Sequence, residues 1–418
     1  MRLFIALFIV SLGSVACNVT SQAGSQWPQW RGPMGQGRAT SGAYASEFGP
    51  DQNLAWKVAL PGRGCSTPIV WNQQIFVTCP VDGSDALLAY DWAGKQQWST
   101  PIGKERPGKH RNGSGANPSP VTDGTFIFTY FKSGNVAGFD MSGKLLWTHN
   151  LQKTYGKDTL YWDLGSSPVL VDDYVVFTVM QEKGSYLVAY EKASGTLAWK
   201  TDRNYKTPSE NDHSYTTPIV YPLRGKQAIM VWGAEHIDAF DGADGKMMWT
   251  CDGFNSEGKA NWVTVASPVH VGDVVVIPFG RGKRLIGVPT DGEGQVEQAW
   301  RRTDIGAFCP TPASDGKRVY VLGDSGLVSC IDPASGETLW SDQLPRKAAK
   351  YYSSPTFADG KLYCAREDGI VFVSKIREDG MALLSQNVMG ERIIAAPVAV
   401  NDRLLLRGEA HLFCVAAP

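Results

Sequence analysis

The chain has 418 residues, a formal net charge of −1 and a charged fraction of 19%. Because no long basic or acidic run is present, we exclude nucleic acid as its main partner. Hydrophobic residues make up 43% of the sequence, which is enough for a large core without oligomerisation, so we expect a monomer.

Residues 1–23 have the pattern of a signal peptide. Arg2 precedes an apolar run from Leu3 to Leu12, and small residues follow as far as Cys17. The run is too short to span a membrane comfortably. Two outcomes stay open: ordinary cleavage after residue 16 or 23, or lipidation of Cys17 after cleavage. Both predict export to the periplasm or cell envelope, with membrane contact only through an N-terminal lipid.

Residues 24–52 are rich in Gly, Ser and Pro and contain the string WPQWRGP at Trp27–Pro33. This composition predicts an irregular N-terminal arm. We expect the arm to lay its two tryptophans on the wall of the domain that follows, over residues 53–418.

A short motif then recurs, in which a small residue precedes a proline and apolar or β-branched residues follow. The eight copies are Ser66-Thr67-Pro68, Pro118-Ser119-Pro120, Ser166-Ser167-Pro168, Thr216-Thr217-Pro218, Ala266-Ser267-Pro268, Pro310-Thr311-Pro312, Ser353-Ser354-Pro355 and Ala395-Ala396-Pro397. Successive prolines lie 42 to 52 residues apart. Each interval holds short runs typical of strands, separated by Gly-containing turns, so the period predicts a β-propeller or a solenoid.

A second mark closes most units: a turn followed by a tryptophan. It appears as AYDWAGKQQW, GFDMSGKLLW, AYEKASGTLAW, AFDGADGKMMW and CIDPASGETLW, which end at Trp98, Trp147, Trp199, Trp249 and Trp340. Trp300 keeps the position behind a longer turn, whereas the seventh unit has no such Trp.

The two ends of the chain predict how the repeats close. The eighth unit stops after three strand-like runs, Val398–Val400, Leu404–Leu406 and Leu412–Val415, whereas Asn53–Val58 is a strand with no unit of its own. We therefore expect an all-β, eight-bladed β-propeller of four-stranded antiparallel blades, the last closed by the N-terminal strand. Such closure removes open sheet edges.

The A-x-D-x-x-[ST]-G-x-x-x-W pattern resembles the tryptophan-docking motif of the PQQ-like, or quinoprotein-type, β-propeller family. The resemblance implies that the repeat tryptophans, and also Trp56, pack between neighbouring blades while the glycine makes the turn. The opening WPQWRGP is similar to exported propellers of planctomycete type. The family has a branch of dehydrogenases that hold PQQ and Ca²⁺ on the axis, and a non-enzymatic scaffold branch of the BamB type. Length, and the absence from the sequence of an adjacent Cys-Cys pair and of CxxCH, favour the second.

Candidate binding residues lie in the loops between one unit's Trp and the next unit's proline, which would open on one face of the ring. Aromatic side chains together with Arg and His suit a planar anionic ligand or a peptide. The alternative is that these aromatic residues cap the ring and the charges solvate its rim. The candidates are His110, Arg111, Asn112, Tyr155, Trp162, Asp163, Asp212, His213, Tyr215, Asn261, Trp262, Phe308, Tyr351, Tyr352 and Arg392.

Strings that look catalytic have simpler explanations. Gly323-Asp324-Ser325-Gly326 falls at a hairpin turn of its unit, and Asp241–Gly245 at a Trp-motif turn without calcium-loop spacing. The six histidines show no metal-pair spacing, so we predict no metal site and no catalytic residue. The cysteines within strand runs, such as Cys330, Cys364 and Cys414, are expected to be small buried hydrophobes.

We therefore expect an exported cell-envelope binding or scaffold protein that uses the long-loop face for a protein or small-ligand partner, without a cofactor. The sequence does not distinguish this function from that of a non-enzymatic ligand sensor. The alternative is a PQQ- and Ca²⁺-dependent oxidoreductase acting on alcohols or sugars. In that case His213 or Asp212 would be the base, and Trp262 would stack on the quinone.

Overall fold

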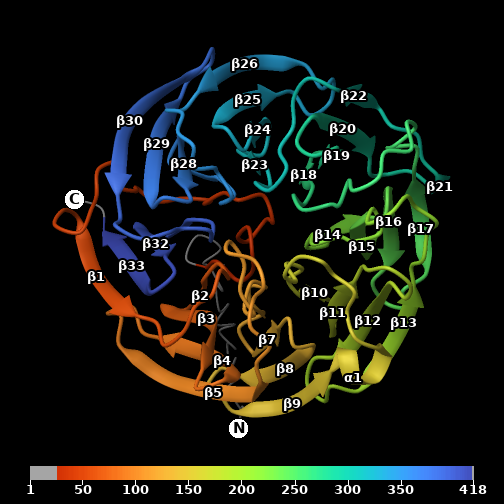
Figure 1. Cartoon of the computed structure of the whole chain (residues 1–418), viewed down its shortest axis with the longest axis horizontal. Helices are drawn as coiled ribbons and strands as arrows, with labels where there is room; N and C mark the ends of the chain where they lie inside the picture. Colours follow the sequence, from red (N-terminus) through yellow and green to blue (C-terminus); the bar gives the residue numbers. More distant parts are fainter. Residues whose placement is uncertain (1–25, 417–418) are drawn as a thin grey trace, which may run out of the picture.

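A computed structural model describes residues 26–416, which form eight antiparallel sheets arranged in a ring (Figure 1). The predicted eight-bladed propeller is confirmed. Within the described residues one short helix, α1 (Leu151–Tyr155), accompanies the strands, and no helix of that part is long and apolar enough to cross a membrane. The expected signal peptide and Cys17 lie outside the described residues.

Each blade runs from an inner strand beside the axis to an outer strand at the rim. Blades 1 to 4 are β2 (Ile69–Trp71), β3 (Gln74–Val81), β4 (Ser84–Tyr90) and β5 (Gln96–Lys104); β6 (Val121–Thr122), β7 (Phe126–Tyr130), β8 (Asn135–Asp140) and β9 (Leu145–Asn150); β10 (Val169–Val171), β11 (Tyr174–Val179), β12 (Tyr186–Glu191) and β13 (Leu197–Asp202); and β14 (Ile219–Leu223), β15 (Lys226–Gly233), β16 (His236–Asp241) and β17 (Met247–Cys251). Blades 5 to 8 are β18 (Val269–Val271), β19 (Val274–Phe279), β20 (Arg284–Pro289) and β22 (Trp300–Arg302); β23 (Ala313–Ser314), β24 (Val319–Leu322), β25 (Leu327–Ile331) and β26 (Thr338–Gln343); β27 (Thr356–Ala358), β28 (Lys361–Arg366), β29 (Ile370–Ile376) and β30 (Met381–Val388); and β31 (Val398–Val400), β32 (Arg403–Arg407), β33 (His411–Ala416) and β1 (Leu54–Ala59). A further two-residue strand, β21 (Gly294–Gln295), pairs in parallel with β17.

The two middle strands of each blade are buried on both faces and read as apolar runs, whereas the outer strands are partly exposed. For example, β11 (YVVFTV) is almost entirely buried, but β13 (LAWKTD) is half exposed. Burial between neighbouring blades on both faces therefore favours Val, Ile and Leu in succession, and the core lies between the blades rather than in one place.

The N-terminal strand closes the ring, as the sequence predicts. β1 pairs antiparallel with β33, with Lys57 opposite Phe413 and Val58 opposite Leu412. The eighth sheet therefore joins the two ends of the chain. This pairing leaves no blade of the ring incomplete.

The docking of tryptophans between blades is seen in atomic detail. The glycine of one Trp-motif turn lies against the tryptophan of the preceding blade: a Cβ placed on Gly143 would be 2.4 Å from the ring of Trp98, and Gly143 has φ +86°. Gly94 lies in the same way against Trp56 of the closing strand. Five tryptophans follow this arrangement: Trp56, Trp98, Trp147, Trp199 and Trp300.

Two of the predicted docking residues depart from the pattern. The Trp249 indole N–H donates to the Tyr221 hydroxyl at 2.8 Å within its own blade, because the next blade has a longer turn that contributes β21 instead. Trp340 packs with Leu362 and Phe372 of the seventh blade without a glycine beneath it.

The N-terminal arm lies across the channel, where Trp27 is buried in a cluster with Val70 and Val398 of the inner strands. The backbone of Trp27 pairs with that of Val70 in β2, and the carbonyl of Pro28 accepts from the N–H of Thr122 in β6. Further along, Gln36 contacts β18 and β23, and Arg38 lies beside Phe357 in β27. These partners all follow the anchor prolines on their inner strands, so the arm crosses the mouth of the channel opposite the long loops.

Candidate functional site

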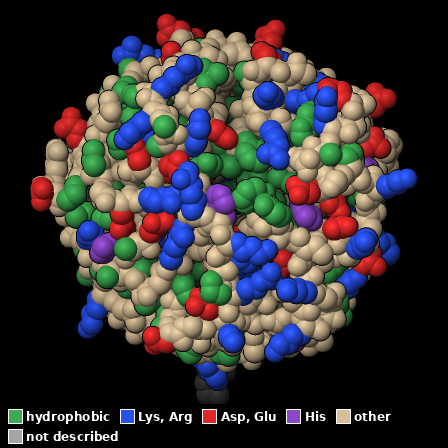
Figure 2. All heavy atoms as spheres, in the orientation of Figure 1, with side chains coloured by type: hydrophobic (Ala, Val, Ile, Leu, Met, Phe, Trp, Pro, Cys, Tyr) green, Lys and Arg blue, Asp and Glu red, His purple; other side chains and the backbone are tan. Residues whose placement is uncertain are grey.

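A funnel-shaped cavity of about 420 Å³ lies on the axis of the ring, within the size range of small-molecule sites. It opens on the long-loop face, meaning the face that carries the loops from each outer strand to the next inner strand; α1 lies on this face. Figure 2 shows a central hollow lined by hydrophobic side chains, with Lys and Arg around it. We call this cavity the axial funnel. Trp30 of the arm lines it and also lines the cavity under the arm, so this side chain separates the two.

The structure brings seven of the fifteen candidate residues together in the axial funnel. They come from the loops after β5, β9, β13, β22 and β26: His110, Asn112, Trp162, Asp163, Tyr215, Phe308 and Tyr352. The other eight lie elsewhere: Arg111, Tyr155, Asp212, His213, Asn261, Trp262, Tyr351 and Arg392 do not line the funnel.

Asp163 organises one side of the funnel. Its carboxylate accepts hydrogen bonds from the backbone N–H groups of Lys109 and His110, at 2.9–3.0 Å, and from the Lys132 ammonium at 2.5 Å. Lys132 also donates to the carbonyl of Pro107 at 2.8 Å. The side chains of Lys132 and Asp163 are only 3% and 1% exposed. This buried ion pair therefore fixes the loop that presents His110 to the funnel.

Aromatic residues continue the wall from there. The rings of His110 and Trp162 meet edge to face with centroids 4.7 Å apart. The Tyr215 hydroxyl accepts from the backbone N–H of Trp162 at 3.0 Å, and burial raises the pKa of this tyrosine. Tyr215 therefore stays neutral and fixes the backbone at Trp162, while the indole itself packs against the ring of His110.

A charged network links the loops at the rim. The Arg392 guanidinium donates to the carbonyl of Arg111 at 3.0 Å, contacts the side chain of Asn112, and pairs with Glu367 at 3.0 Å. Arg111 lies 3.7 Å from the same carboxylate, with its own side chain 70% exposed. Arg392 thus ties the seventh and eighth blades to the loop of the first, while Arg111 faces solvent.

Three more candidates lie away from the funnel, among them His213 and Trp262, which the oxidoreductase alternative would use. His213 is buried in the wall, and its Nε2 lies 3.5 Å from the Thr159 hydroxyl. Trp262 packs edge to face on Phe279 and under the Arg284 guanidinium. Tyr155 packs against Tyr186 instead.

The other three residues outside the funnel have structural or exposed positions. Asn261 is exposed and accepts from Arg281 through its carbonyl. Tyr351 is buried against Gly326 and Phe372, and Asp212 is half-buried beside His213.

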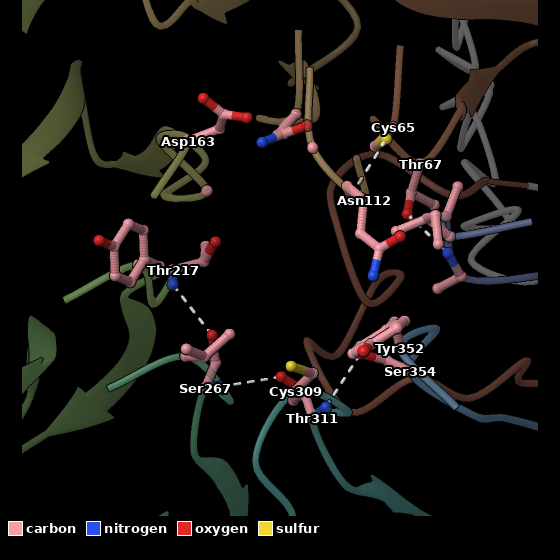
Figure 3. Close-up of a pocket in the computed structure, with 18 of the residues that line it drawn as sticks. Cys65, Thr67, Asn112, Asp163, Thr217, Ser267, Cys309, Thr311, Tyr352 and Ser354 are labelled. Carbon is pink, nitrogen blue, oxygen red and sulfur yellow. Dashed lines mark hydrogen bonds between the residues drawn. The ribbon is translucent and has the colours of Figure 1, made fainter. Parts of the chain in front are cut away.

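The innermost residues of the funnel were not among the predicted candidates, although they belong to the repeated proline motif. The residue before each anchor proline is Ser or Thr in seven blades, and all seven side chains line the funnel: Thr67, Ser119, Ser167, Thr217, Ser267, Thr311 and Ser354. We call them the hydroxyl ring. Figure 3 shows Thr217, Ser267, Thr311 and Ser354 following one another around the axis. Ala396 takes the eighth position.

Two cysteines, Cys65 and Cys309, also line the funnel, and both are free thiols. Burial raises the pKa of both, that of Cys309 well above its ordinary value, with the nearby Asp324 carboxyl adding to the effect. Because the nucleophilic and metal-binding form of cysteine is the thiolate, these neutral thiols are not suited to catalysis or to metal binding. The predicted turn at Gly323–Gly326 joins β24 to β25, and the Asp324 carboxylate accepts from the N–H groups of Phe308 and Cys309.

The donor set of the funnel does not fit PQQ with Ca²⁺. Calcium takes six to eight oxygen ligands, with carboxylates prominent among them. Within the described residues the funnel is lined by a single carboxylate, Asp163, which is already engaged by Lys132 and two backbone N–H groups. Over residues 26–416 no group of three His, Cys, Asp or Glu side chains is placed to hold a metal ion.

Comparison with known proteins places the chain in a family. A family model described as outer membrane protein assembly factor BamB matches residues 48–202, 133–306 and 293–407, which together span most of the chain. The curated outer membrane protein assembly factor BamB of Moranella endobia is 22% identical over 324 residues, covering 74% of this chain and 76% of that protein.

Solved structures share the fold at low sequence identity. BamB from Moraxella catarrhalis superposes with a TM-score of 0.61 at 14% identity, covering 87% of this chain and 97% of that chain. A europium-containing methanol dehydrogenase superposes with a TM-score of 0.67 at 13% identity, covering 92% and 89%. Fold similarity therefore extends both to a dehydrogenase and to BamB, and the family match decides between them: the chain belongs to the PQQ-like β-propeller family, in its BamB-like branch.

Proposed function

We propose that the protein is an exported cell-envelope scaffold that binds a partner protein or small ligand through its long-loop face. One observation carries the proposal: the two mouths of the channel differ. The arm of residues 26–52 crosses one mouth and is hydrogen-bonded to inner strands on several sides, for example from Gln36 to His270 at 2.8 Å. The other mouth opens as the axial funnel among the longest loops.

The rim of this face has the chemistry of a binding surface. Arg111 and Tyr161 are 70% and 61% exposed. The rings of Trp162 and His110 contact each other and form part of the wall of the funnel. Exposed Arg and aromatic side chains around a concave apolar centre are typical of recognition sites. Membership of the BamB-like branch supports an envelope protein as partner.

A photocrosslinking experiment tests the proposal. A photoreactive amino acid would be placed at Arg111 or Tyr161 on the long-loop face, with Met247 on the outer strand β17 as the matched control because it is 49% exposed. We expect defined crosslinks to envelope proteins from the two face positions and none from the control. Equal crosslinking from Met247, or none from either face position in folded protein, would contradict the proposal.

The oxidoreductase alternative has its own test. Purified protein would be titrated with PQQ and Ca²⁺ and assayed for dye-linked oxidation of alcohols and sugars. Because the carboxylate of the funnel is engaged by Lys132, we expect no Ca²⁺-dependent binding of PQQ and no turnover; observing both would overturn the scaffold function. For the mode of export, mass spectrometry of the mature N-terminus decides between a start after residue 16 or 23 and lipidation of Cys17.

A further inference from the structure

The hydroxyl ring presents seven donors whose protons are uncommitted. Each oxygen of the ring accepts a hydrogen bond from the backbone N–H at the equivalent position of the preceding blade, over 2.8–3.3 Å, as from Ser267 N–H to Thr311. No hydroxyl of the ring donates to an acceptor among residues 26–416. All seven side chains are more than nine-tenths buried, with Thr217 and Ser354 the most exposed at 7%. Because buried donors without acceptors cost free energy, the ring is suited to an acceptor supplied from outside the chain.

The repeat explains why the ring points inward. A proline follows each member, and the residue before a proline is confined to extended conformations. Each hydroxyl oxygen is held at the channel wall because it accepts from the backbone N–H of the preceding blade, so its proton must point elsewhere. Seven copies of one local geometry therefore aim their donors at one axis.

Charges near the ring favour an anion. Arg31 of the arm is 2% exposed and donates to the carbonyls of Pro312 and Pro355, the residues directly after two members of the ring, at 2.8 and 2.6 Å. Its Nε has no partner among the described residues. Burial lowers its pKa to about 9, which leaves the guanidinium charged at neutral pH. Arg281 also lines the funnel, whereas the charge of Asp163 is offset by Lys132.

Besides the ring and polar residues such as His110, Asn112 and Arg281, the funnel has an apolar part of its wall. Trp162, Phe308, Val265 and Ile394 line this part, with Trp30 also contributing to the cavity. The Trp162 ring packs against His110, and the Arg281 guanidinium lies 5.4 Å from the centre of the Phe308 ring. The cavity of about 420 Å³ therefore has room for an apolar or aromatic body over the polar ring.

We propose that the axial funnel binds a small organic anion, with a carboxylate or phosphate head accepting from the hydroxyl ring and an apolar or aromatic body packed on Trp162 and Phe308. This inference rests on the proposed function, because it names the ligand class of the same face. The oxygens of a carboxylate or phosphate have several lone pairs, and these can accept hydrogen bonds from more than one hydroxyl of the ring. The positive charge of Arg31, which has no acidic partner among the described residues, attracts the anion through space.

Benzoate is a suitable probe, with benzyl alcohol as its neutral counterpart and inorganic phosphate as a head group without a body. Binding would be followed by calorimetry and by the fluorescence of the funnel tryptophans. We expect saturable 1:1 binding of benzoate, weaker binding of phosphate and none of benzyl alcohol at the same concentrations. Equal binding of benzoate and benzyl alcohol would overturn the anionic head; absence of benzoate binding would overturn the inference as a whole.

Variants of the ring locate the site. Ser267→Ala removes one donor and should weaken benzoate about tenfold, the effect of one hydrogen bond to a charged group. Ser374→Ala is the matched control, since this buried hydroxyl of β29 lies outside the funnel. Ala396→Ser completes the ring and also supplies an acceptor for the Ser354 N–H, which has none among the described residues. It should tighten benzoate several-fold and raise the unfolding midpoint.

Unchanged affinity in both Ser267→Ala and Ala396→Ser would refute the site even if benzoate binds. Failure of the anion-binding inference can be distinguished from failure of the proposed scaffold function. Intact crosslinking from the long-loop face without benzoate binding overturns only the ligand class, whereas loss of crosslinking counts against the proposed function itself.

Discussion

The buried pair of Lys132 and Asp163 gives the sharpest test of how the funnel is held. We predict that Lys132→Met destabilises the protein by about 3–5 kcal/mol, because removing one partner leaves an uncompensated buried charge. The Asp163 carboxylate would keep its hydrogen bonds from Lys109 and His110 but lose the ammonium at 2.5 Å, in a position 1% exposed. Equilibrium unfolding in guanidinium chloride, followed by tryptophan fluorescence, measures the change.

A double-mutant cycle separates the ion pair from other effects of the substitutions. Asp163→Asn should also be destabilising, since it leaves the Lys132 ammonium buried with only the carbonyl of Pro107 and an amide oxygen. The double variant Lys132→Met/Asp163→Asn buries no charge, so its cost should fall short of the sum of the single costs by about 2 kcal/mol or more.

The control is Lys246→Met, which removes an ion pair to Asp244 in which the side chains are 83% and 43% exposed. Exposed pairs contribute little, so this variant should unfold at the midpoint of the parent. The reasoning is refuted if Lys132→Met also unfolds at that midpoint, or if the two single costs add in the double variant.

Two further predictions concern contacts between the first and second blades. Burial raises the pKa of Asp85 to about 6, although hydrogen bonds from Ser133 and Asn135 oppose the shift. The folded protein therefore binds this proton more tightly than the unfolded chain does, so stability falls as pH rises from about 4 to about 6; Asp85→Asn should abolish this fall and add about 2 kcal/mol at pH 7. Urea unfolding at pH 4.5 and 7 measures both effects, and an unchanged pH dependence in the variant would contradict the assignment. Gly143→Ala should cost well over 1 kcal/mol, because its Cβ would lie 2.4 Å from Trp98 in addition to the strain of a positive φ. Gly83→Ala carries the same kind of φ with nothing within 4 Å, so it isolates the backbone strain; equal costs for the two variants would rule out docking as the cause.

The site was only partly predictable from the sequence. His110, Trp162 and Tyr215 were expected on the long-loop face and do line the funnel, but His213 and Trp262, in similar loops, turn into the wall instead. Loop residues share a face because the repeat fixes where the loops begin and end. Whether a side chain points toward the axis depends on contacts such as the one between Asp163 and the backbone of His110. These contacts join different blades, and no local pattern predicts them.

The path of the N-terminal arm was likewise not predictable from the sequence. Trp27–Pro33 has no periodicity, so the sequence indicated an irregular segment against the wall of the ring but not its path across the channel. Arg31 is held by carbonyls of residues 281 and 324 positions away. Such a path across the channel becomes available only when the ring has closed.

By itself, the sequence determined the number of blades, the closing strand and the Gly-containing turns that precede most of the repeat tryptophans, because each follows from a period of 42 to 52 residues and from local turn chemistry. The tertiary structure decided which mouth of the channel is open and that the anchor hydroxyls form a ring. Each hydroxyl accepts from the backbone N–H of the preceding blade, and the first member, Thr67, meets its partner Ala396 only when β1 pairs with β33 and closes the ring.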